Sequence, residues 1–380
     1  MDYTSQNLVF RLKKIFRYTR LYGLRRTLAK VRGQYHMKYN YKSLPKVGLL
    51  KPNSRAHIGL IGCGNYAFSN IAYYLDRYQP GLIRGVMDTD INRSASLCQK
   101  YTASYYTSDF NKILEDDGIN LIYIASNHAS HAEYAISCIS AGKHVHIEKP
   151  HVVSEDQLNR LLSVIKKNPE VRVYLGFNRP RTRLFKDLMN LLAEESGPLM
   201  INWFIAGHEI PDDHWYFEKK EGGRVLGNLC HWTDLTLQMV GLVNAFPCQI
   251  VPASPPDSKS DFAVSIIFAD NSSSTITFSA KGHTFEGVRE ILNVHKGNLL
   301  GNLTDFQSLT VDILDRKIIR KSFHRDHGHH LNIINSLVSE IGEDSQYVFA
   351  TAKLFLAIKL AMETGSQVML PFNEAMVLPK

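Results

Sequence analysis

The stretch IGLIGCGNYA, residues 58–67, decides the fold of this chain. An apolar run ends at Gly62, and the pattern Gly62-x-Gly64-x-x-Ala67 leads into a segment with helical character. The first glycine permits a tight turn, the second lets main-chain N–H groups approach a diphosphate, and the small third residue lets helix and strand pack closely. The spacing predicts a dinucleotide-binding turn. Its cofactor-binding residues are expected to be Gly62, Gly64, Asn65, Tyr66 and Ala67.

An acidic residue follows the next apolar run at the distance that such a turn requires. Asp88 ends the run 83–87, 21 residues after Ala67. A carboxylate there accepts hydrogen bonds from both ribose hydroxyls and repels a 2′-phosphate, which favours NAD over NADP. Arg93 is near enough in sequence to leave NADP as an alternative.

Short apolar runs alternate with helical patterns through the first half of the chain. The expected strands are His57–Ile61, Ile83–Met87, Leu121–Ala125, Val145–Ile147 and Val171–Gly176. Helices are expected near residues 65–74 and over 132–140, with another opening at Ser154. Strands that alternate with helices of this length predict a parallel sheet with right-handed crossovers.

The pattern changes after about residue 198. Strands without intervening helices are expected at Met200–Ala206, Phe262–Phe268, Ser274–Ser279 and Arg289–Val294, and late helices at His330–Ile341 and Gln346–Thr364. This predicts an open, mostly antiparallel sheet with helices on one face. We therefore expect an α/β plus α+β chain with an extension and linker (1–55), a dinucleotide-binding domain (56–178) and a substrate or oligomerisation domain (179–380), the last helices returning to the first domain.

The positive net charge, +8, belongs to the N-terminal extension. Residues 1–55 hold 14 Lys/Arg and one acid, whereas the remainder holds 30 basic and 35 acidic residues. Leucines recur at helical spacing on both sides of Gly23, and Pro45, Gly48 and Pro52 mark a linker. No apolar run is long enough to cross a bilayer and no signal-peptide pattern opens the chain, which favours a cytoplasmic protein.

The extension has three possible roles. Residues 5–32 suit the surface of an anionic membrane, with basic side chains near headgroups and leucines dipped in. They also suit a helical arm packed on the body or on a second subunit. Contact with nucleic acid is disfavoured, because no nucleic-acid motif accompanies the charge.

Lys149 follows a strand end, where a parallel sheet opens onto its ligand crevice. Oxidation of an alcohol needs a group that takes the hydroxyl proton, and a partly desolvated lysine beside a cationic ring gives up its own proton more readily. A surface lysine that merely ends a strand is the alternative.

Three pieces of sequence together resemble the glucose–fructose oxidoreductase/inositol dehydrogenase (Gfo/Idh/MocA) family. They are the glycine turn, the segment 126–150 that ends in Glu148-Lys149-Pro150, and Gly222-Gly223-Arg224 with Cys230-His231-Trp232-Thr233-Asp234. The resemblance implies an N-terminal Rossmann domain, a bound nicotinamide cofactor, and Lys149 and His231 as catalytic residues. It also implies a homodimer or homotetramer, because the open sheet often forms a subunit interface in that family.

Further site residues follow from the same resemblance and from residue chemistry. At the cofactor they are Ser126, Asn127, His131, Glu148 and Lys149. At the substrate they are Lys149, Asn178, Arg179, Trp215, Asn228 and His231. Asn178 and Arg179 suit sugar hydroxyls or anionic groups, with a helix entry as the alternative, and an aromatic face such as Trp215 suits sugar C–H patches, with core packing as the alternative.

One position departs from the family pattern. Members that oxidise sugars or polyols usually carry Asp four residues before the histidine, and this chain has Gly227 there. A sub-branch near polysaccharide-assembly genes has a pattern similar to Gly-Glu-x-Cys-His, which puts Asn228 at the Glu position. An amide orients a hydroxyl but does not accept its proton at neutral pH.

The expected function is an NAD(P)-dependent oxidoreductase acting on a sugar, polyol or nucleotide-sugar hydroxyl, in polysaccharide or glycoconjugate biosynthesis. Gly227 keeps two alternatives open: an NAD(H)-binding subunit without catalysis, and a redox-neutral epimerase or glycoside-cleaving enzyme with tightly bound NAD. No metal is expected, because the histidines of 324–330 are adjacent rather than at helical ligand spacing. The five cysteines form no CxxC pair and are expected as free thiols.

Overall fold

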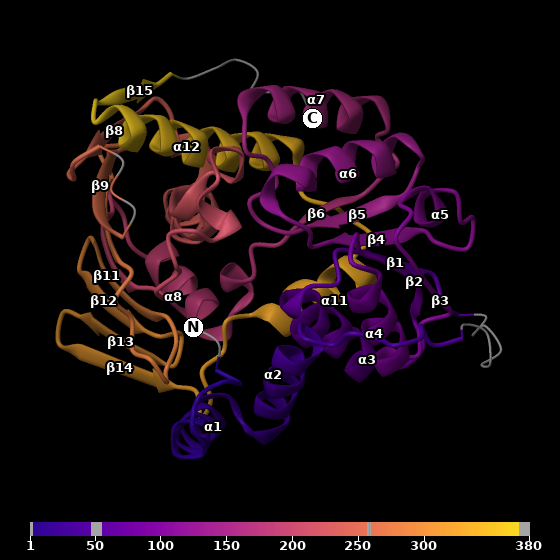
Figure 1. The fold of residues 1–380 in the computed structure, drawn as a ribbon. Helices are drawn as coiled ribbons and strands as arrows, with labels where there is room; N and C mark the ends of the chain where they lie inside the picture. Colours follow the sequence, from indigo (N-terminus) through magenta and orange to yellow (C-terminus); the bar gives the residue numbers. More distant parts are fainter. Residues whose placement is uncertain (1–2, 47–54, 257, 259, 372–380) are drawn as a thin grey trace.

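The computed structural model describes residues 3–46, 55–256, 258 and 260–371, and within them two sheets lie side by side (Figure 1). Gly48 and Pro52 of the expected linker lie outside the described residues. The first sheet has six strands in the order β3-β2-β1-β4-β5-β6, and the second has nine in the order β14-β13-β12-β11-β7-β10-β9-β8-β15. The prediction of a parallel sheet followed by an open sheet is confirmed.

All strands of the six-stranded sheet are parallel, and the order 3-2-1-4-5-6 is that of a Rossmann domain. Its strands are β1 (Ile58–Ile61), β2 (Ile83–Met87), β3 (Tyr105–Thr107), β4 (Leu121–Ile124), β5 (His144–Ile147) and β6 (Val173–Leu175). Each of β1 and β4 is buried at every residue, because helices cover both faces.

The helices of this domain are η1 (Ala67–Ile71) continuing into α3 (Ala72–Tyr78), α4 (Ile91–Tyr101), α5 (Asn111–Leu114), α6 (His128–Ser140) and α7 (Glu155–Lys167). The expected helix over 132–140 starts four residues too late. Its first turn is set by a long-range contact, because the Ala129 N–H donates to the carboxylate of Glu221 at 3.0 Å. The short strand β3 and helix α4 were missed.

The nine-stranded sheet is antiparallel except where β7 (Met200–Ala206) runs parallel to β10 (Ser273–Ser279). The other strands are β8 (Cys248–Pro252), β9 (Asp261–Ile267), β11 (Arg289–Lys296), β12 (Leu299–Thr304), β13 (Ser308–Ile313), β14 (Arg316–Lys321) and β15 (Val368–Leu370). Only β7, β9, β10 and β11 were predicted from the sequence. Buried and exposed residues alternate along each of these four strands, so one face of the sheet faces the core.

Helices cover that inner face: α8 (Arg183–Ala193), α9 (Cys230–Val240), α10 (Leu242–Ala245) and α12 (Ser345–Thr364). Helix α11 (His329–Val338) instead packs on the Rossmann domain, where Ile333 and Ile334 join its core and Tyr123 donates to the Ile333 carbonyl at 2.7 Å. Short helical turns complete the chain: η2 (Arg179–Arg181), η3 (Trp215–Phe217), η4 (Lys219–Glu221) and η5 (Val225–Leu229).

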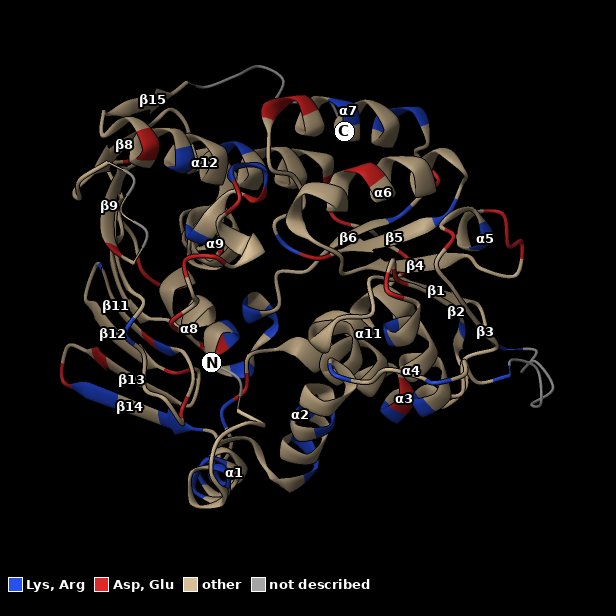
Figure 2. Ribbon diagram, in the orientation of Figure 1, with Lys and Arg blue, Asp and Glu red and all other residues tan. Residues whose placement is uncertain are grey.

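The basic extension forms two helices, α1 (Leu8–Tyr22) and α2 (Leu24–His36), hinged at Gly23 with φ 83°. We call residues 3–46 the arm. The arm lies below the two sheets in Figure 1, and several of its residues are Lys or Arg, coloured blue in Figure 2. In the described part of the chain, no helix is both long and apolar enough to span a membrane.

Candidate active site

The glycine turn has the geometry that its sequence predicts. Gly62 adopts φ 86°, and a Cβ added there would meet the Ala125 carbonyl oxygen at 2.5 Å, so only glycine fits. Gly64 faces open space, with nothing within 4 Å of an added Cβ. Ala67 is buried between helix and strand. The turn therefore offers an uncovered main chain at the position where a diphosphate would approach.

Asp88 lies against this turn at the end of β2. Its Oδ2 accepts from the Cys63 N–H at 2.7 Å and its Oδ1 from the Asp90 N–H at 2.9 Å. These bonds fix the buried carboxylate beside the turn, where a ribose would lie. Arg93 lies 3.2 Å from Asp90 in an ion pair, so its charge is already partly compensated within α4. The turn, Asp88 and this pairing fit NAD.

His36 of the arm contacts the same turn. The His36 Nε2 lies 2.7 Å from the Cys63 carbonyl and Nδ1 lies 2.9 Å from Ser96 Oγ, while the ring stacks on Phe68 at 4.1 Å. Burial, opposed by the bond to Cys63, lowers the pKa of His36. Nothing in the local sequence marks this residue, and we did not predict it.

The loop after β4 is tied to the second domain. Asn127 donates to Glu221 Oε1 at 2.6 Å, and the Ala129 N–H donates to Oε2 of the same carboxylate. Ser126 Oγ lies 2.7 Å from Ser130 Oγ. Glu221 is buried, and its hydrogen bonds connect η4 to the start of α6 and hold this loop beside the glycine turn.

Two residues that the resemblance places at the cofactor are buried inside the protein. His131 has Nδ1 2.9 Å from the Pro150 carbonyl and Nε2 3.1 Å from the Ser126 carbonyl. Glu148 is buried 3.5 Å from His146. The positions suit residues that hold the two loops around the cofactor rather than residues that touch it.

Lys149 and His231 come from different domains and line one cavity. The Lys149 Nζ donates to the Gly227 carbonyl at 2.6 Å, and the Lys149–Pro150 peptide is cis. His231 is buried, and its Nδ1 has no hydrogen-bond partner in the described part of the chain. Burial, followed by the charges of Arg179 and Lys149, lowers the pKa of His231 well below its usual value, so the ring is neutral.

The side chain that family members place at position 227 has no room here. A Cβ added to Gly227 would run into the Tyr216 ring, and it would lie 2.5 Å from His128 Cε1. Tyr216 donates to Asn228 Oδ1 at 2.6 Å. Tyr216 and its partner Asn228 therefore occupy the space of the missing carboxylate. The Trp215 ring lies nearby, 5.2 Å from the His128 ring.

Arg179 lies on the cavity wall, but Asn178 does not. Arg179 pairs with buried Glu290 at 2.5 Å and lies over the Trp232 ring at 5.1 Å. Burial would raise the pKa of Glu290, but Arg179 and His327 outweigh it and hold the pKa at about 2. The Asn178 amide donates to the His327 carbonyl and is buried away from the cavity wall.

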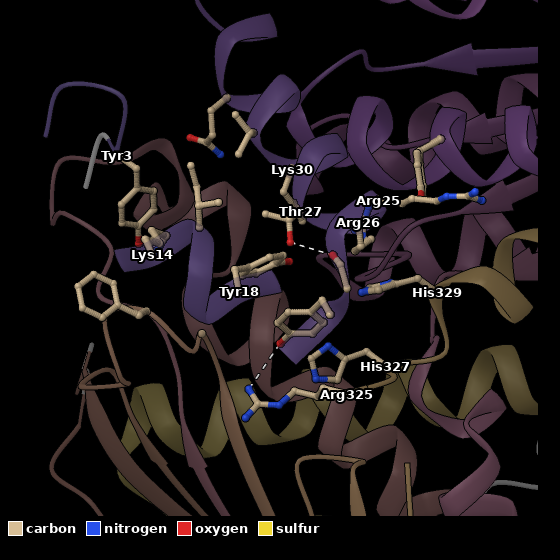
Figure 3. A pocket seen from close by; sticks show the side chains of 18 of the residues that line it. Tyr3, Lys14, Tyr18, Arg25, Arg26, Thr27, Lys30, Arg325, His327 and His329 are labelled. Atoms are coloured by element: carbon tan, nitrogen blue, oxygen red, sulfur yellow. Dashed lines mark hydrogen bonds between the residues drawn. The ribbon is translucent and has the colours of Figure 1, made fainter. Parts of the chain in front are cut away.

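The cavity that joins these residues has a volume of about 1140 Å³. We call its lower wall the floor: Lys149, Arg179, His231, Arg325, His327 and His329. We call the α1 and α2 side chains opposite them the roof. Figure 3 shows Tyr18, Arg26 and Lys30 of the roof across from Arg325, His327 and His329. His327 lies 3.2 Å from Glu290, and His329 lies 3.3 Å from the Tyr66 hydroxyl. In the described residues, no group of three potential metal ligands is close enough together to form a metal site.

Comparison with known proteins places this geometry in a known group. Residues 56–177 match the Gfo/Idh/MocA family model, described as an oxidoreductase family with an NAD-binding Rossmann fold. Oxidoreductase P35 of Formosa agariphila is 29% identical over 37% of this chain and 43% of its own length. The myo-inositol 2-dehydrogenase of Thermotoga maritima is 28% identical over 37% of this chain and 41% of its own. The chain thus spans about half or less of the length of these curated relatives.

Solved structures extend the likeness over both domains. A levoglucosan dehydrogenase in complex with NADH and L-sorbose superposes with a TM-score of 0.69 over 83% of this chain and 99% of that one, at 20% sequence identity. At that identity the likeness concerns the fold. The arm lies within the part of this chain that precedes the family match.

Proposed function

We propose that this chain, whose residues 56–177 match the Gfo/Idh/MocA family model, is an NAD-dependent oxidoreductase acting on a hydroxyl of a sugar, polyol or nucleotide-sugar. The observation that carries the proposal is the meeting of Lys149 and His231, from two domains, in one cavity beside the turn at Gly62–Ala67. Polar groups that converge in a large cleft at the carboxyl ends of a parallel sheet are typical of such a site.

The residues present suit the steps that alcohol oxidation needs. Gly62, Gly64 and Asp88 would seat NAD, which supplies the two-electron acceptor when bound. Lys149 would take the hydroxyl proton, held in place by its bond to the Gly227 carbonyl. His231, neutral because burial and neighbouring cations lower its pKa, would accept a hydrogen bond from the same hydroxyl and orient it.

Substitution of Lys149 tests this assignment. Lys149→Ala should bind NADH as the wild type does and lose about 10²- to 10⁴-fold in turnover, the usual contribution of a general acid or base. The measurement is NADH fluorescence for binding and nicotinamide absorbance over a panel of sugars, polyols and sugar nucleotides for turnover. Lys112→Ala, at an exposed lysine of the same domain, is the matched control. Equal turnover in the two variants would remove Lys149 from the mechanism.

Gly227 motivates a second candidate. Because Tyr216 fills the space of the family's usual carboxylate, the chain would in this case bind NAD(H) without net oxidation, as a sensing or regulatory subunit. A wild-type chain that binds NADH tightly but reduces no NAD with any member of the panel would favour it. NAD that survives purification and turns over without net NADH would instead favour a redox-neutral epimerase or glycoside-cleaving enzyme.

We further propose that two copies pair through the outer face of the nine-stranded sheet, in a dimer or a tetramer. Met200, Phe204, Ile267 and Leu300 are exposed, large and apolar on the strands of this sheet. Exposed large apolar residues on one sheet face are typical of subunit contacts. Sedimentation of wild type against Phe204→Lys tests it, with a monomeric wild type as the contrary result.

The pattern around Asn228 and His231 favours a role in polysaccharide or glycoconjugate biosynthesis.

A further inference from the structure

The arm closes the cavity by binding both domains at once. On the α1 side, Arg17 pairs with Glu286 and the Phe10 ring lies 5.0 Å from Phe285. On the α2 side, Arg26 donates to the Ser69 carbonyl and to Asn70. The arm is therefore a fixed wall of the cavity rather than a free tail, and its inward side chains face whatever occupies the space above Lys149.

Those inward side chains combine aliphatic and tyrosine residues with five cations. The roof contributes Arg11, Lys14, Arg25, Arg26 and Lys30 to the cavity lining. The floor adds Lys149, Arg179 and Arg325, and the carboxylate found among the lining residues is that of Asp326, which accepts from the Gly328 N–H at 2.8 Å. An occupant of this cavity would meet positive charge from above and from below.

The roof cations differ from those of the floor in their partners. Lys14 donates to the Thr284 carbonyl at 2.8 Å, and Arg26 bonds a carbonyl and an amide, so neither has a carboxylate partner among the residues that the structure describes. Lys30 makes no hydrogen bond or ion pair with any described residue. The buried Arg11 Nε is likewise without an acceptor among them. Enclosed cations without a counter-charge destabilise the folded state, so their presence indicates that a bound anion compensates them.

The electrostatic surroundings of Lys30 lead to the same conclusion. The groups whose charges interact with it are Arg26 on its own helix, His208 after β7 and His329 on α11. Burial, then Arg26, lowers the pKa of Lys30 to about 7, and burial lowers that of Lys14 to about 8. Burial, then Lys14 and Lys30, lowers the pKa of His208 to about 4. Each group is destabilised in its charged form, which an anion would reverse.

We propose that the roof is an anion-binding site for the diphosphate of a sugar diphosphate ester whose sugar lies at Lys149 and His231. The roof is separate from the glycine turn, since Gly62, Gly64 and Asp88 are absent from the described lining of the cavity, and the cavity meets the expected coenzyme site at Tyr66 and Lys149. The proposal rests on the proposed function for the placement of the sugar. The volume of about 1140 Å³ is large for a monosaccharide alone and suits a ligand with a diphosphate and a further group attached.

Two sources share this chemistry: a nucleotide-sugar and a polyprenyl diphosphate sugar. Apolar residues of α1 bear on the choice, because Leu8 and Leu12 line the cavity and are partly exposed, and Val9 and Phe16 are exposed on the same helix. A helix with exposed apolar residues among basic ones suits a lipid tail or a membrane surface. The experiment therefore compares a nucleotide probe with a lipid probe.

The test is calorimetry. UDP-glucose, farnesyl diphosphate or glucose is titrated into the whole chain in the presence of NADH. Lys30→Gln and Lys14→Gln remove roof charges, and Lys13→Gln removes an exposed charge of α1 that does not line the cavity. We expect both diphosphates to bind more tightly than glucose, and each roof variant to weaken them at least about tenfold while Lys13→Gln does not. Tighter binding of UDP-glucose or of farnesyl diphosphate identifies the source.

Diphosphates that bind no more tightly than glucose, or roof variants that bind them as Lys13→Gln does, would overturn the proposal. NADH titration of the same variants separates this outcome from a failure of the proposed function. Unchanged NADH affinity in Lys30→Gln is expected, since Lys30 is outside the coenzyme site. A wild type that binds diphosphates but not NADH would remove the oxidoreductase assignment and leave the anion site standing.

Discussion

The floor and the roof of the cavity hold positive charge in opposite ways. On the floor, Arg179 pairs with Glu290 at 2.5 Å and Arg325 pairs with Asp305 at 2.8 Å, all of them buried. In the roof, Lys30 has no carboxylate partner in the described part of the chain. A buried cation with a carboxylate is part of the fold, because removing its partner is costly, whereas an enclosed cation without one is available to a ligand. Positive charge thus has a structural role at Arg179 and Arg325 of the floor and a binding role at Lys30 of the roof.

The largest effect that separates the two walls is expected at Glu290. Glu290→Gln keeps an acceptor for the Trp232 N–H, now 2.9 Å away, but leaves Arg179 buried without a counter-charge. We expect the free energy of unfolding to fall by about 3–5 kcal/mol, measured by urea denaturation. Glu363→Gln, which breaks an exposed pair with Lys359, should cost less than about 0.5 kcal/mol. If the two variants cost the same, the floor cations are not structural.

Packing at Gly227 provides the next largest test, because Lys149 of the floor donates to the Gly227 carbonyl and the space beside that glycine is filled. Gly227→Ala puts a methyl group into the Tyr216 ring and should lower the free energy of unfolding by about 1–3 kcal/mol. Tyr216→Ala leaves room, so the double variant should lose less than the sum of the single ones. Strict additivity in denaturant unfolding would show that Tyr216 does not fill this space. The result also decides whether an acid can be restored at position 227 without first removing the tyrosine.

The pH dependence of anion binding sharpens the comparison from the roof side. With pKa values lowered to about 7 and about 8, Lys30 and Lys14 lose their protons as pH rises from 6 to 9, and an anion favours the protonated forms. We expect the affinity for UDP-glucose, whose diphosphate diester does not titrate in this range, to fall by up to about tenfold per pH unit for each proton taken up. The measurement is calorimetry in buffers of different ionisation enthalpy. A flat profile would mean that neither lysine meets the anion.

The sequence predicted best what depends on neighbours along the chain. The glycine turn, the strand Ile83–Met87 and Asp88 follow from local pattern, and all lie where the spacing places them. Strand β14 was missed because its segment RKIIRK carries little apolar signal and lies at the edge of the sheet. Burial of one strand face is a tertiary property, and four strands of nine were enough to indicate an open sheet.

The site was less predictable for a similar reason. Lys149 and His231 carry motif signals, but His36, Tyr216 and Glu221 act across separations that no local pattern records: His36 to Cys63, Tyr216 to Gly227 and Glu221 to Asn127. The sequence left the basic extension with three roles. Its contacts with Glu286 and Ser69 show a packed arm, and the unpaired charges beneath it became visible only once the cavity was known.

The last test is the most specific, because it predicts a gain of stability. The pKa of Lys30 is about 7 in the fold and about 10.4 in an unfolded chain, so between these values the unfolded chain binds more protons and stability rises with pH. Lys30→Gln should therefore raise the Tm at pH 6.5, where the enclosed charge is fully present, and lose that advantage by pH 9.5. Lys13→Gln, exposed on α1, should leave the Tm unchanged at both pH values. A Tm lowered by Lys30→Gln would give this lysine a structural role like that of Arg179, and the distinction between roof and floor would be lost.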